Sequence, residues 1–301
     1  MELQNMDNPL RKAMVVLPPF LWLILLFLIP FFIILIVSFS EYADAIPPYN
    51  IFFGYDAALG KFKFQPDFAN FEFLISDPIY LSSCLNSIKI AAISTVCALL
   101  VGYPIALGIA DAEKSTQKLL LMLIMVPFWT SLLIRVYSWT MILKGSGLLN
   151  SLLISIGLID TPLQLLNTQF AVILGIVYCY LPFMVLPLYL AIEKIDSALI
   201  EASLDLGCTP FKSLITVTLP LTIPGIVAGS MLVFLPAVGE FVIPELLGGA
   251  QVLTVGKVIW GEFFLNRDWP IAASITIILT MAFVIPIMLM QKALAKRGYY
   301  E

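Results

Sequence analysis

Two carboxylates stand inside an apolar stretch of this 301-residue chain, in the segment Gly239–Glu245 (GEFVIPE). A charged group in such surroundings is costly unless it binds a cation or accepts hydrogen bonds. Glu240 and Glu245 are therefore candidates for holding a positively charged solute. The alternative for Glu240 is a structural ion pair with Arg135, which lies in another apolar stretch. Both roles are compatible if the pair breaks while the protein works.

Aromatic side chains offer a second way to hold a cation, because an ammonium group is attracted to the face of a Trp or Tyr ring. Trp129 and Tyr178 lie well inside apolar stretches and are the aromatic candidates for such a pathway. Trp and Tyr also gather at membrane interfaces because they are amphipathic. We expect Trp260 and Trp269 to be interface anchors, or contacts for a protein outside the membrane.

Few other reactive groups are present. The chain has no His, which removes the commonest general base and the commonest metal ligand. Its four Cys residues form no CxxC pair and are expected to be free packing thiols. Gly256-Lys257 is followed by Val258 and lacks the upstream glycine of a nucleotide-binding P-loop. We therefore expect no catalytic residue, no metal site and no cofactor on this chain.

The composition shows what kind of fold must position these groups. Apolar residues make up 60% of the chain, charged residues only 12%, and the mean hydropathy is +1.00. Soluble domains are closer to half apolar and a quarter charged, and a soluble fold of this size could not bury so much apolar surface. These values exclude a soluble enzyme, a disordered protein and a nucleic-acid binder. They indicate an all-α integral membrane protein in which lipid covers the apolar exterior.

Six apolar segments are long enough to cross a bilayer, which takes about 20 helical residues. Continuous rather than alternating apolar runs favour helices over strands. We predict one membrane domain over residues 1–301, with spans near Met14–Phe39, Leu85–Ala110, Leu119–Leu143, Phe170–Ile192, Leu219–Leu247 and Ile271–Met290.

An even number of spans places both ends of the chain on one side, and the positive-inside rule identifies that side. The loop Glu41–Leu81 holds six acids and two lysines, which suits the outside. Both termini are then expected in the cytoplasm. The segments assigned to the inside hold Arg11, Lys12, Lys114, Lys118, Lys194, Lys212, Lys292, Lys296 and Arg297.

The inner loop Glu193–Thr218 has the sequence pattern of a helical hairpin. Asp196 and Ser197 can cap a short helix that runs to Leu206, Gly207 can end it, and Thr209-Pro210 can start a second helix. Its apolar positions recur at helical spacing and are Ile195, Leu199, Ala202 and Leu206. An apolar face on a cytoplasmic loop indicates a docking surface. The alternative is a helical loop lying against the bilayer.

The spacing within this loop resembles the EAA motif of ABC importer permeases. Glu201-Ala202-Ser203 is followed by Gly207 and, nine residues later, by Val217-Thr218-Leu219-Pro220. Ser203 replaces the third-position Ala of the family pattern, and Val217 replaces an Ile. The resemblance implies that the hairpin is the coupling helix that contacts an ATPase subunit. The residues implied in this coupling are Glu201, Ala202, Ser203, Gly207, Leu219 and Pro220.

Almost the whole chain resembles the membrane subunits of polyamine (spermidine/putrescine) ABC importers, most closely the permease of putrescine systems. The stretches that carry this resemblance are Val126–Thr130 with Arg135 and Tyr137, Gly157–Pro162, Tyr180–Tyr189, Leu235–Gly249 and Asn266–Pro270. The resemblance implies a type I importer (MetI-like) fold in the bacterial inner membrane. Its implied partners are a second permease subunit, an ATPase dimer that binds Mg-ATP, and a soluble polyamine-binding protein.

Two other functions remain open from the sequence. An ABC permease for another small solute would share the EAA loop. A six-span channel or secondary transporter is a rival from a different class, but it would leave the spacing from Glu201 to Pro220 unexplained.

Overall fold

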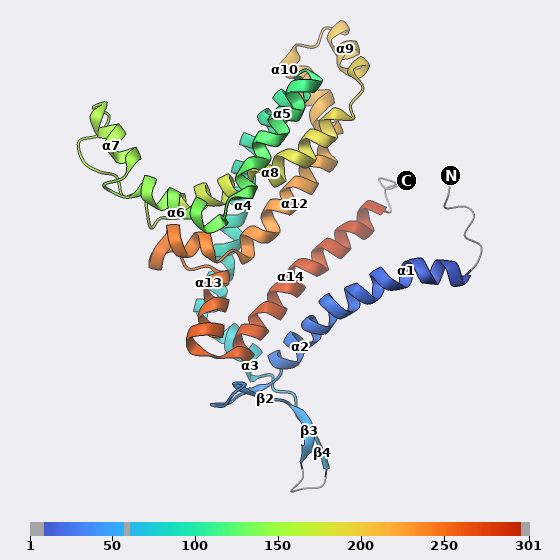
Figure 1. Ribbon diagram of the computed structural model, residues 1–301, viewed down its shortest axis with the longest axis vertical. Coiled ribbons are helices and arrows are strands. Elements are labelled where there is room, and N and C mark those ends of the chain that lie inside the picture. Colours follow the sequence, from blue (N-terminus) through green and yellow to red (C-terminus); the bar gives the residue numbers. More distant parts are fainter. Residues whose placement is uncertain (1–8, 57–60, 296–301) are drawn as a thin grey trace. The chain divides into compact units, whose positions relative to one another are not determined.

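The computed structural model describes residues 9–56 and 61–295, and its elements are mainly helices (Figure 1). Lys296 and Arg297, counted above among the inner charges, lie outside the described residues. The chain divides into two compact units. One unit comprises the residues up to Pro78 and those from Ile259 onward, and the other comprises Ile79–Val258.

The first unit is built on a long apolar helix. α1 (Pro9–Leu23), η2 (Ile24–Leu28) and α2 (Ile29–Ser38) follow one another without a break, and Met14–Ser38 is long and apolar enough to span a membrane. α14 (Trp269–Ala295) packs against α2 and α3 (Ala69–Ser76). The Ser274 hydroxyl donates to the Ser38 carbonyl at 2.9 Å. The predicted spans at 14–39 and 271–290 are thus helical in the structure.

The predicted outer loop of the first unit contains short strands, which the sequence reasoning did not anticipate. β1 (Glu41–Tyr42) pairs antiparallel with β2 (Tyr49–Asn50), and β3 (Phe53–Asp56) pairs antiparallel with β4 (Lys61–Phe64). The ring of Phe39 packs on the rings of Phe52, Phe68 and Phe71 at 5.1 to 6.3 Å between centroids. A local aromatic cluster therefore holds this loop together. η7 (Gly261–Asn266) completes the unit before α14.

The second unit carries all of the candidate coupling and pathway residues. Its elements, in chain order, are α4 (Pro78–Ala110), α5 (Lys114–Met125), η3 (Val126–Trp129), α6 (Leu132–Leu143), α7 (Leu148–Ser155), α8 (Gln169–Glu193), α9 (Ser197–Asp205), α10 (Pro210–Ser213), η4 (Leu214–Thr218), α11 (Leu219–Leu221), α12 (Ile223–Gly239), η5 (Pro244–Gly248), η6 (Gly249–Gln251) and α13 (Val255–Trp260).

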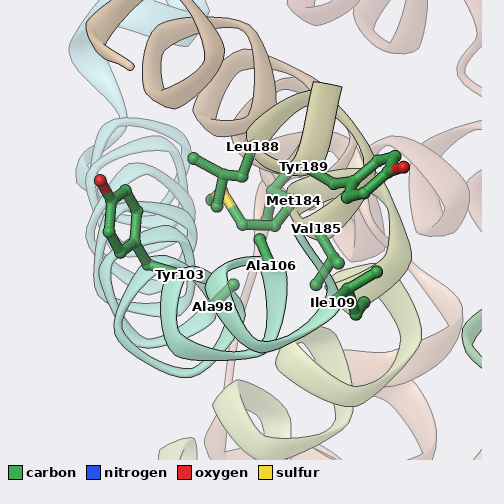
Figure 2. Packing of buried hydrophobic residues seen from close by; sticks show 9 residues of the cluster. Ala98, Tyr103, Ala106, Ile109, Met184, Val185, Leu188 and Tyr189 are labelled. Atoms are coloured by element: carbon green, nitrogen blue, oxygen red, sulfur yellow. The ribbon is translucent and has the colours of Figure 1, made fainter. Parts of the chain in front are cut away.

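The core of the second unit lies where α4, α8 and α12 pack together (Figure 2). Its buried side chains are Ala98, Tyr103, Ala106, Ile109, Met184, Val185, Leu188, Tyr189 and Val233. Small residues let α8 and α12 approach closely. A Cβ added at Gly229 would lie 2.9 Å from the Met184 sulfur, and one at Gly225 would lie 2.8 Å from the Pro187 carbonyl oxygen. These helices therefore form a tightly packed scaffold for the charged groups.

Two predicted spans are wrong as continuous helices. The segment predicted at 119–143 is broken, because Lys114–Trp129 and Leu132–Ser155 meet at 89°. The segment predicted at 219–247 is bent by 69° between Pro210–Leu221 and Ile223–Gly239. Proline explains much of this, since it lacks the N–H that the helical ladder needs, and Pro127 and Pro224 flank the two breaks. The segments predicted at 85–110 and 170–192 lie within α4 and α8, which are each unbroken and long and apolar enough to span a membrane.

Candidate functional site

The hairpin predicted over residues 193–218 has the local structure that its sequence predicts. The Asp196 carboxylate accepts the N–H of Ala198 at 3.0 Å and so caps α9. Gly207 follows α9 with φ +85°, a left-handed conformation that glycine adopts at little cost. The Cys208 N–H donates to the Ser203 carbonyl and the Gly207 N–H to the Leu204 carbonyl, at 3.1 and 2.9 Å. This pair of bonds is a Schellman motif, which ends the helix sharply.

A hydroxyl pair joins the two helices of the hairpin. Thr209 caps α10 by accepting the N–H of Lys212 at 3.3 Å. The hydroxyls of Ser203 and Ser213 lie 2.5 Å apart, and both side chains are buried. Ser203 was predicted to lie at the coupling contact, but its side chain faces into the hairpin. Its role in the structure is to hold α9 against α10. Ser213 carries no sequence signal that marks it as the partner.

The exposed surface of the hairpin combines apolar side chains with the two acids Glu201 and Asp205. Glu201, Ala202 and Gly207 are exposed, as expected for coupling residues. Leu206 is 86% exposed, and Phe211 at the start of α10 is 71% exposed. Phe211 therefore adds to the exposed apolar side chains of the hairpin. It could not be predicted from the helical spacing of apolar residues in α9, because it lies in α10. Leu219 and Pro220 are also exposed, but they lie in α11 beside the bend at Thr222.

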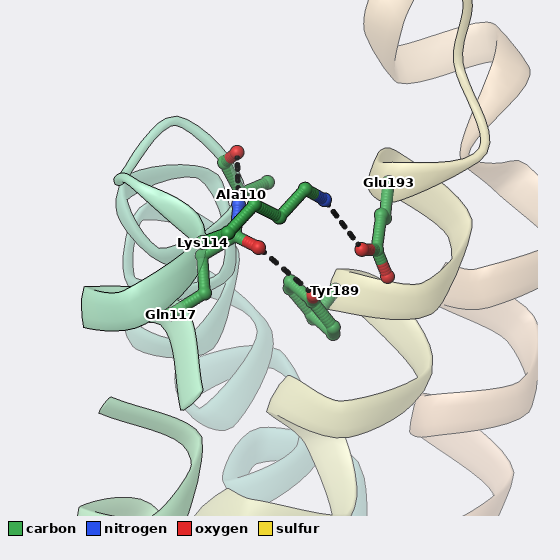
Figure 3. A network of polar contacts seen from close by, with 5 residues as sticks. All are labelled: Ala110, Lys114, Gln117, Tyr189 and Glu193. Atoms are coloured by element: carbon green, nitrogen blue, oxygen red, sulfur yellow. Dashed lines mark hydrogen bonds and ion pairs between the residues drawn. The ribbon is translucent and has the colours of Figure 1, made fainter. Parts of the chain in front are cut away.

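Polar contacts tie the base of the hairpin to the neighbouring helices (Figure 3). The Lys114 ammonium lies 3.0 Å from the Glu193 carboxylate, which ends α8. The buried Tyr189 hydroxyl donates to the Gln117 side-chain carbonyl at 3.5 Å, and the Gln117 amide donates to the Ala110 carbonyl at 2.9 Å. The ends of α4, α5 and α8 are therefore linked where the chain enters the hairpin. The ion pair is exposed, so water screens it and it stabilises this arrangement little.

The hairpin does not pack flush against these helices. A cavity of about 750 Å³ separates it from the turn between α4 and α5, with Leu204, Phe211 and Leu214 among the lining residues on the hairpin side. The hairpin is held at its two ends by the chain and internally by its serine pair.

The buried carboxylate, Glu240, occupies a second helix break. α12 ends at Gly239, and Glu240 itself is extended, with φ −64° and ψ 131°. One carboxylate oxygen accepts the N–H groups of Val242 and Ile243 at 3.0 and 3.4 Å. The other accepts a hydrogen bond from the Tyr180 hydroxyl. Glu240 is only 9% exposed, so these three neutral donors replace water around its charge.

The position of Tyr180 shows how deep Glu240 lies. Tyr180 is 13 residues before Glu193 in α8, about 20 Å along the helix, so Glu240 is level with the middle of α8. Because the chain bends by 69° between Pro210–Leu221 and Ile223–Gly239, this position does not follow from counting residues along one straight helix. Tyr180 was not among the predicted pathway residues. Its separation of 60 residues from Glu240 left no local signal.

A close backbone contact fixes this break. A Cβ added at Gly256 would lie 2.6 Å from the carbonyl oxygens of Gly239 and Glu240. Only glycine fits at such a distance without moving the backbone. The start of α13 is thus packed directly on the peptide that carries the buried carboxylate.

Arg135 does not form the ion pair with Glu240 that the sequence left open; both residues are described, and no ion pair joins them. The guanidinium carbon lies 5.5 Å from the centre of the Phe128 ring. Its Nε and Nη1 atoms are buried without a hydrogen-bond partner. The charge is therefore held mainly by an aromatic face.

The remaining candidates lie apart from the Glu240–Tyr180 pair. Glu245 pairs with Lys257 at 3.0 Å, and the same ammonium donates to the Gly249 carbonyl at 2.6 Å. Trp129 is 76% exposed. Tyr178 packs edge-on against Trp139 at 5.5 Å between centroids. The structure thus brings together Glu240 and Tyr180, and it gives Glu245 a cation of its own.

Comparisons with known proteins assign the chain to a known class. The chain belongs to the family of binding-protein-dependent transport system inner membrane components, whose family model matches residues 90–298. The chain is therefore an inner-membrane transport subunit, and the match extends over both compact units.

Individual relatives narrow this class. The spermidine/putrescine transport system permease protein PotB of Haemophilus influenzae is 40% identical over 287 residues, which cover 95% of each chain. The Escherichia coli protein of the same name is 45% identical over 226 residues, covering 75% of this chain and 81% of that one. Among solved structures, a bacterial alginate ABC transporter in complex with its alginate-bound periplasmic protein matches with a TM-score of 0.71 at 18% identity, covering 97% of this chain and 95% of that one. The predicted ABC importer permease fold is confirmed.

Proposed function

We propose that this chain is a permease subunit of an ATP-driven polyamine importer and moves putrescine or spermidine across the inner membrane. The relatives at 40 to 46% identity that carry the name spermidine/putrescine permease support this substrate class. The observation on the chain itself that carries the proposal is Glu240, a buried carboxylate at a helix break in the middle of the fold. The chain's membership of the binding-protein-dependent transport family gives no support to a channel or a secondary transporter.

The Glu240 site suits an alkyl ammonium ion chemically. A carboxylate shielded from water binds an ammonium group far more strongly than an exposed one does. Tyr180 and Phe183 lie 6.0 Å apart between ring centroids, and rings so close to the carboxylate offer faces to the cation and to its methylene chain. The three hydrogen bonds that Glu240 now accepts come from neutral groups, so its negative charge is free to meet a substrate.

The hairpin supplies the connection to ATP. In this proposal an ATPase dimer, which binds Mg-ATP, docks on the exposed face formed by Glu201, Leu206 and Phe211. When the ATPases close, the hairpin moves, and the movement passes to α8 and to the bent helix that leads into α12. The pathway past Glu240 would then open alternately to the two sides. This chain contributes no covalent chemistry.

The remaining partners follow from the same proposal. A second, related permease subunit completes the pathway, and a soluble binding protein delivers the polyamine to the outer face. Docking of the ATPase on the hairpin places the Glu193 end of α8 in the cytoplasm. With the predicted spans, both termini then lie in the cytoplasm.

Uptake by the reconstituted complex tests the proposal. The complex, with its ATPase, second permease and binding protein, is placed in proteoliposomes, and uptake of labelled putrescine and spermidine is measured. We expect ATP-dependent uptake of at least one polyamine that stops when the binding protein is omitted. ATP-dependent uptake of a different solute, with neither polyamine transported, would overturn the proposal.

A further inference from the structure

We propose, on the basis of the function proposed above, that Arg135 is an internal cation that alternates with the substrate's ammonium group at Glu240. In the loaded site the ammonium binds the carboxylate and Arg135 rests on Phe128. When the ammonium leaves, the guanidinium takes its place. Glu240 then meets one cation at a time, and Arg135 drives release of the substrate.

The first argument is the unfavourable environment of Arg135. A guanidinium stays protonated in proteins, and two of its nitrogens are buried here without a hydrogen-bond partner. A cation–π contact such as that with Phe128 replaces only part of the lost hydration. An arginine held in this way gains free energy from any carboxylate that comes within reach.

The second argument is that Glu240 is the matching anion. It is buried and accepts only neutral donors, from Tyr180, Val242 and Ile243. No ion pair joins it to any basic group that the structure describes. The structure therefore holds a separated pair, an uncompensated cation and an uncompensated anion in the same compact unit.

The third argument is that the two charged groups lie at the two ends of one row of aromatic rings. A continuous row of rings leads from one charge to the other. Phe128 lies under the guanidinium and stands perpendicular to Phe183 at 4.9 Å, and Phe183 neighbours Tyr180, which bonds Glu240.

The fourth argument is that both groups lie at hinges. Phe128 is in η3 and Arg135 is in α6, so their contact bridges the 89° bend between the two helices. Glu240 is the extended residue after α12. Breaks of this kind absorb backbone rotation while the packed helices stay rigid. A change in either break therefore alters the distance between the guanidinium and the carboxylate.

Binding of labelled putrescine to the purified complete importer in lipid nanodiscs tests this inference. Arg135→Gln removes the competing charge at similar size, so we expect putrescine to bind about tenfold more tightly, which is about 1.4 kcal/mol, while uptake turnover falls. Arg135→Lys keeps the charge but loses the planar guanidinium, so its putrescine affinity should lie between those of the parent protein and Arg135→Gln. In a Glu240→Gln background, Arg135→Gln should have no such effect.

A second variant keeps the test decisive if Arg135→Gln fails to assemble. Phe128→Leu removes the resting place of the guanidinium and favours its move to Glu240, so putrescine binding should weaken. Unchanged affinity and turnover in Arg135→Gln, or tighter binding in Phe128→Leu, would overturn the inference. If the parent importer neither binds nor transports putrescine or spermidine, the proposed function fails instead, so the two failures are distinguishable. If the parent importer handles spermidine alone, the same variants are compared with labelled spermidine.

Discussion

The hydroxyls of Ser203 and Ser213 lie 2.5 Å apart and join the two helices of the hairpin, α9 and α10. Ser203 also donates to the Ile200 carbonyl at 2.7 Å. Because the single hydroxyl proton of Ser203 is used there, Ser213 must be the donor to Ser203. The family motif has Ala at the position of Ser203, so this chain uses a polar pair where the motif has a methyl group.

This assignment of donors predicts an asymmetric double-mutant cycle. Ser203→Ala leaves the buried Ser213 donor without a partner, which should cost about 1–3 kcal/mol. Adding Ser213→Ala removes the orphaned donor and should recover most of that loss. Protease sensitivity of the hairpin and ATP-driven uptake measure both effects. A double variant as impaired as Ser203→Ala would contradict the assignment.

Gly207 should be sensitive to backbone conformation and to charge in different ways. With φ +85° and no atom within 4 Å of an added Cβ, Gly207→Ala should cost about 1–2 kcal/mol through strain alone. Gly207→Asn should cost less, because Asn tolerates this conformation. Gly207→Asp should insert normally but uncouple ATP hydrolysis from uptake, since its charge enters the docking face. Normal coupled uptake in Gly207→Asp would refute the docking role.

The exposed apolar residues of the hairpin should control ATPase binding. Leu206→Ser and Phe211→Ser remove apolar area that no part of the described chain covers, so the thermal stability of the subunit should change little. Co-purification of the ATPase subunit should fall at least tenfold. Leu158 is 68% exposed next to α7, and Leu158→Ser is the matched control with full ATPase recovery. Equal recovery in all three variants would argue against the docking surface.

Gly256 should be intolerant of any side chain. A methyl group there would clash with two backbone carbonyl oxygens beside Glu240, and such overpacking costs about 1–3 kcal/mol. We expect Gly256→Ala to reduce polyamine uptake severalfold by displacing Glu240. At Gly261 an added Cβ meets nothing within 4 Å, so Gly261→Ala is the control. Full uptake in Gly256→Ala would show that transport does not depend on the exact position of the Glu240 backbone after α12.

The hairpin could be predicted from the sequence because its signals are local. Asp196, Gly207 and Thr209-Pro210 each specify a cap or a turn within a few residues, and each does so in the structure. The serine pair could not be predicted in the same way, because it depends on how α9 folds back onto α10.

The candidate pathway was only partly predictable, because its contacts are distant in sequence. The cost of a buried charge identified Glu240, but its partner Tyr180 lies 60 residues away on another helix. The sequence shows that Arg135 is a charged residue in an apolar segment. The contact of its guanidinium with the Phe128 ring could not be predicted, because it depends on the 89° bend. The bends of 89° and 69° could not be predicted from hydrophobicity, because an apolar segment has the same composition whether its helix is straight or broken.

Polyamine uptake by the Glu240→Gln importer tests the central claim most directly, since this change removes the charge and keeps the shape. We predict that ATP-driven uptake of labelled putrescine and spermidine falls at least tenfold while the complex assembles and binds ATP normally. Asp160→Asn, which alters an exposed carboxylate outside the helices, should transport at the parent rate. Undiminished polyamine uptake by Glu240→Gln would contradict the account.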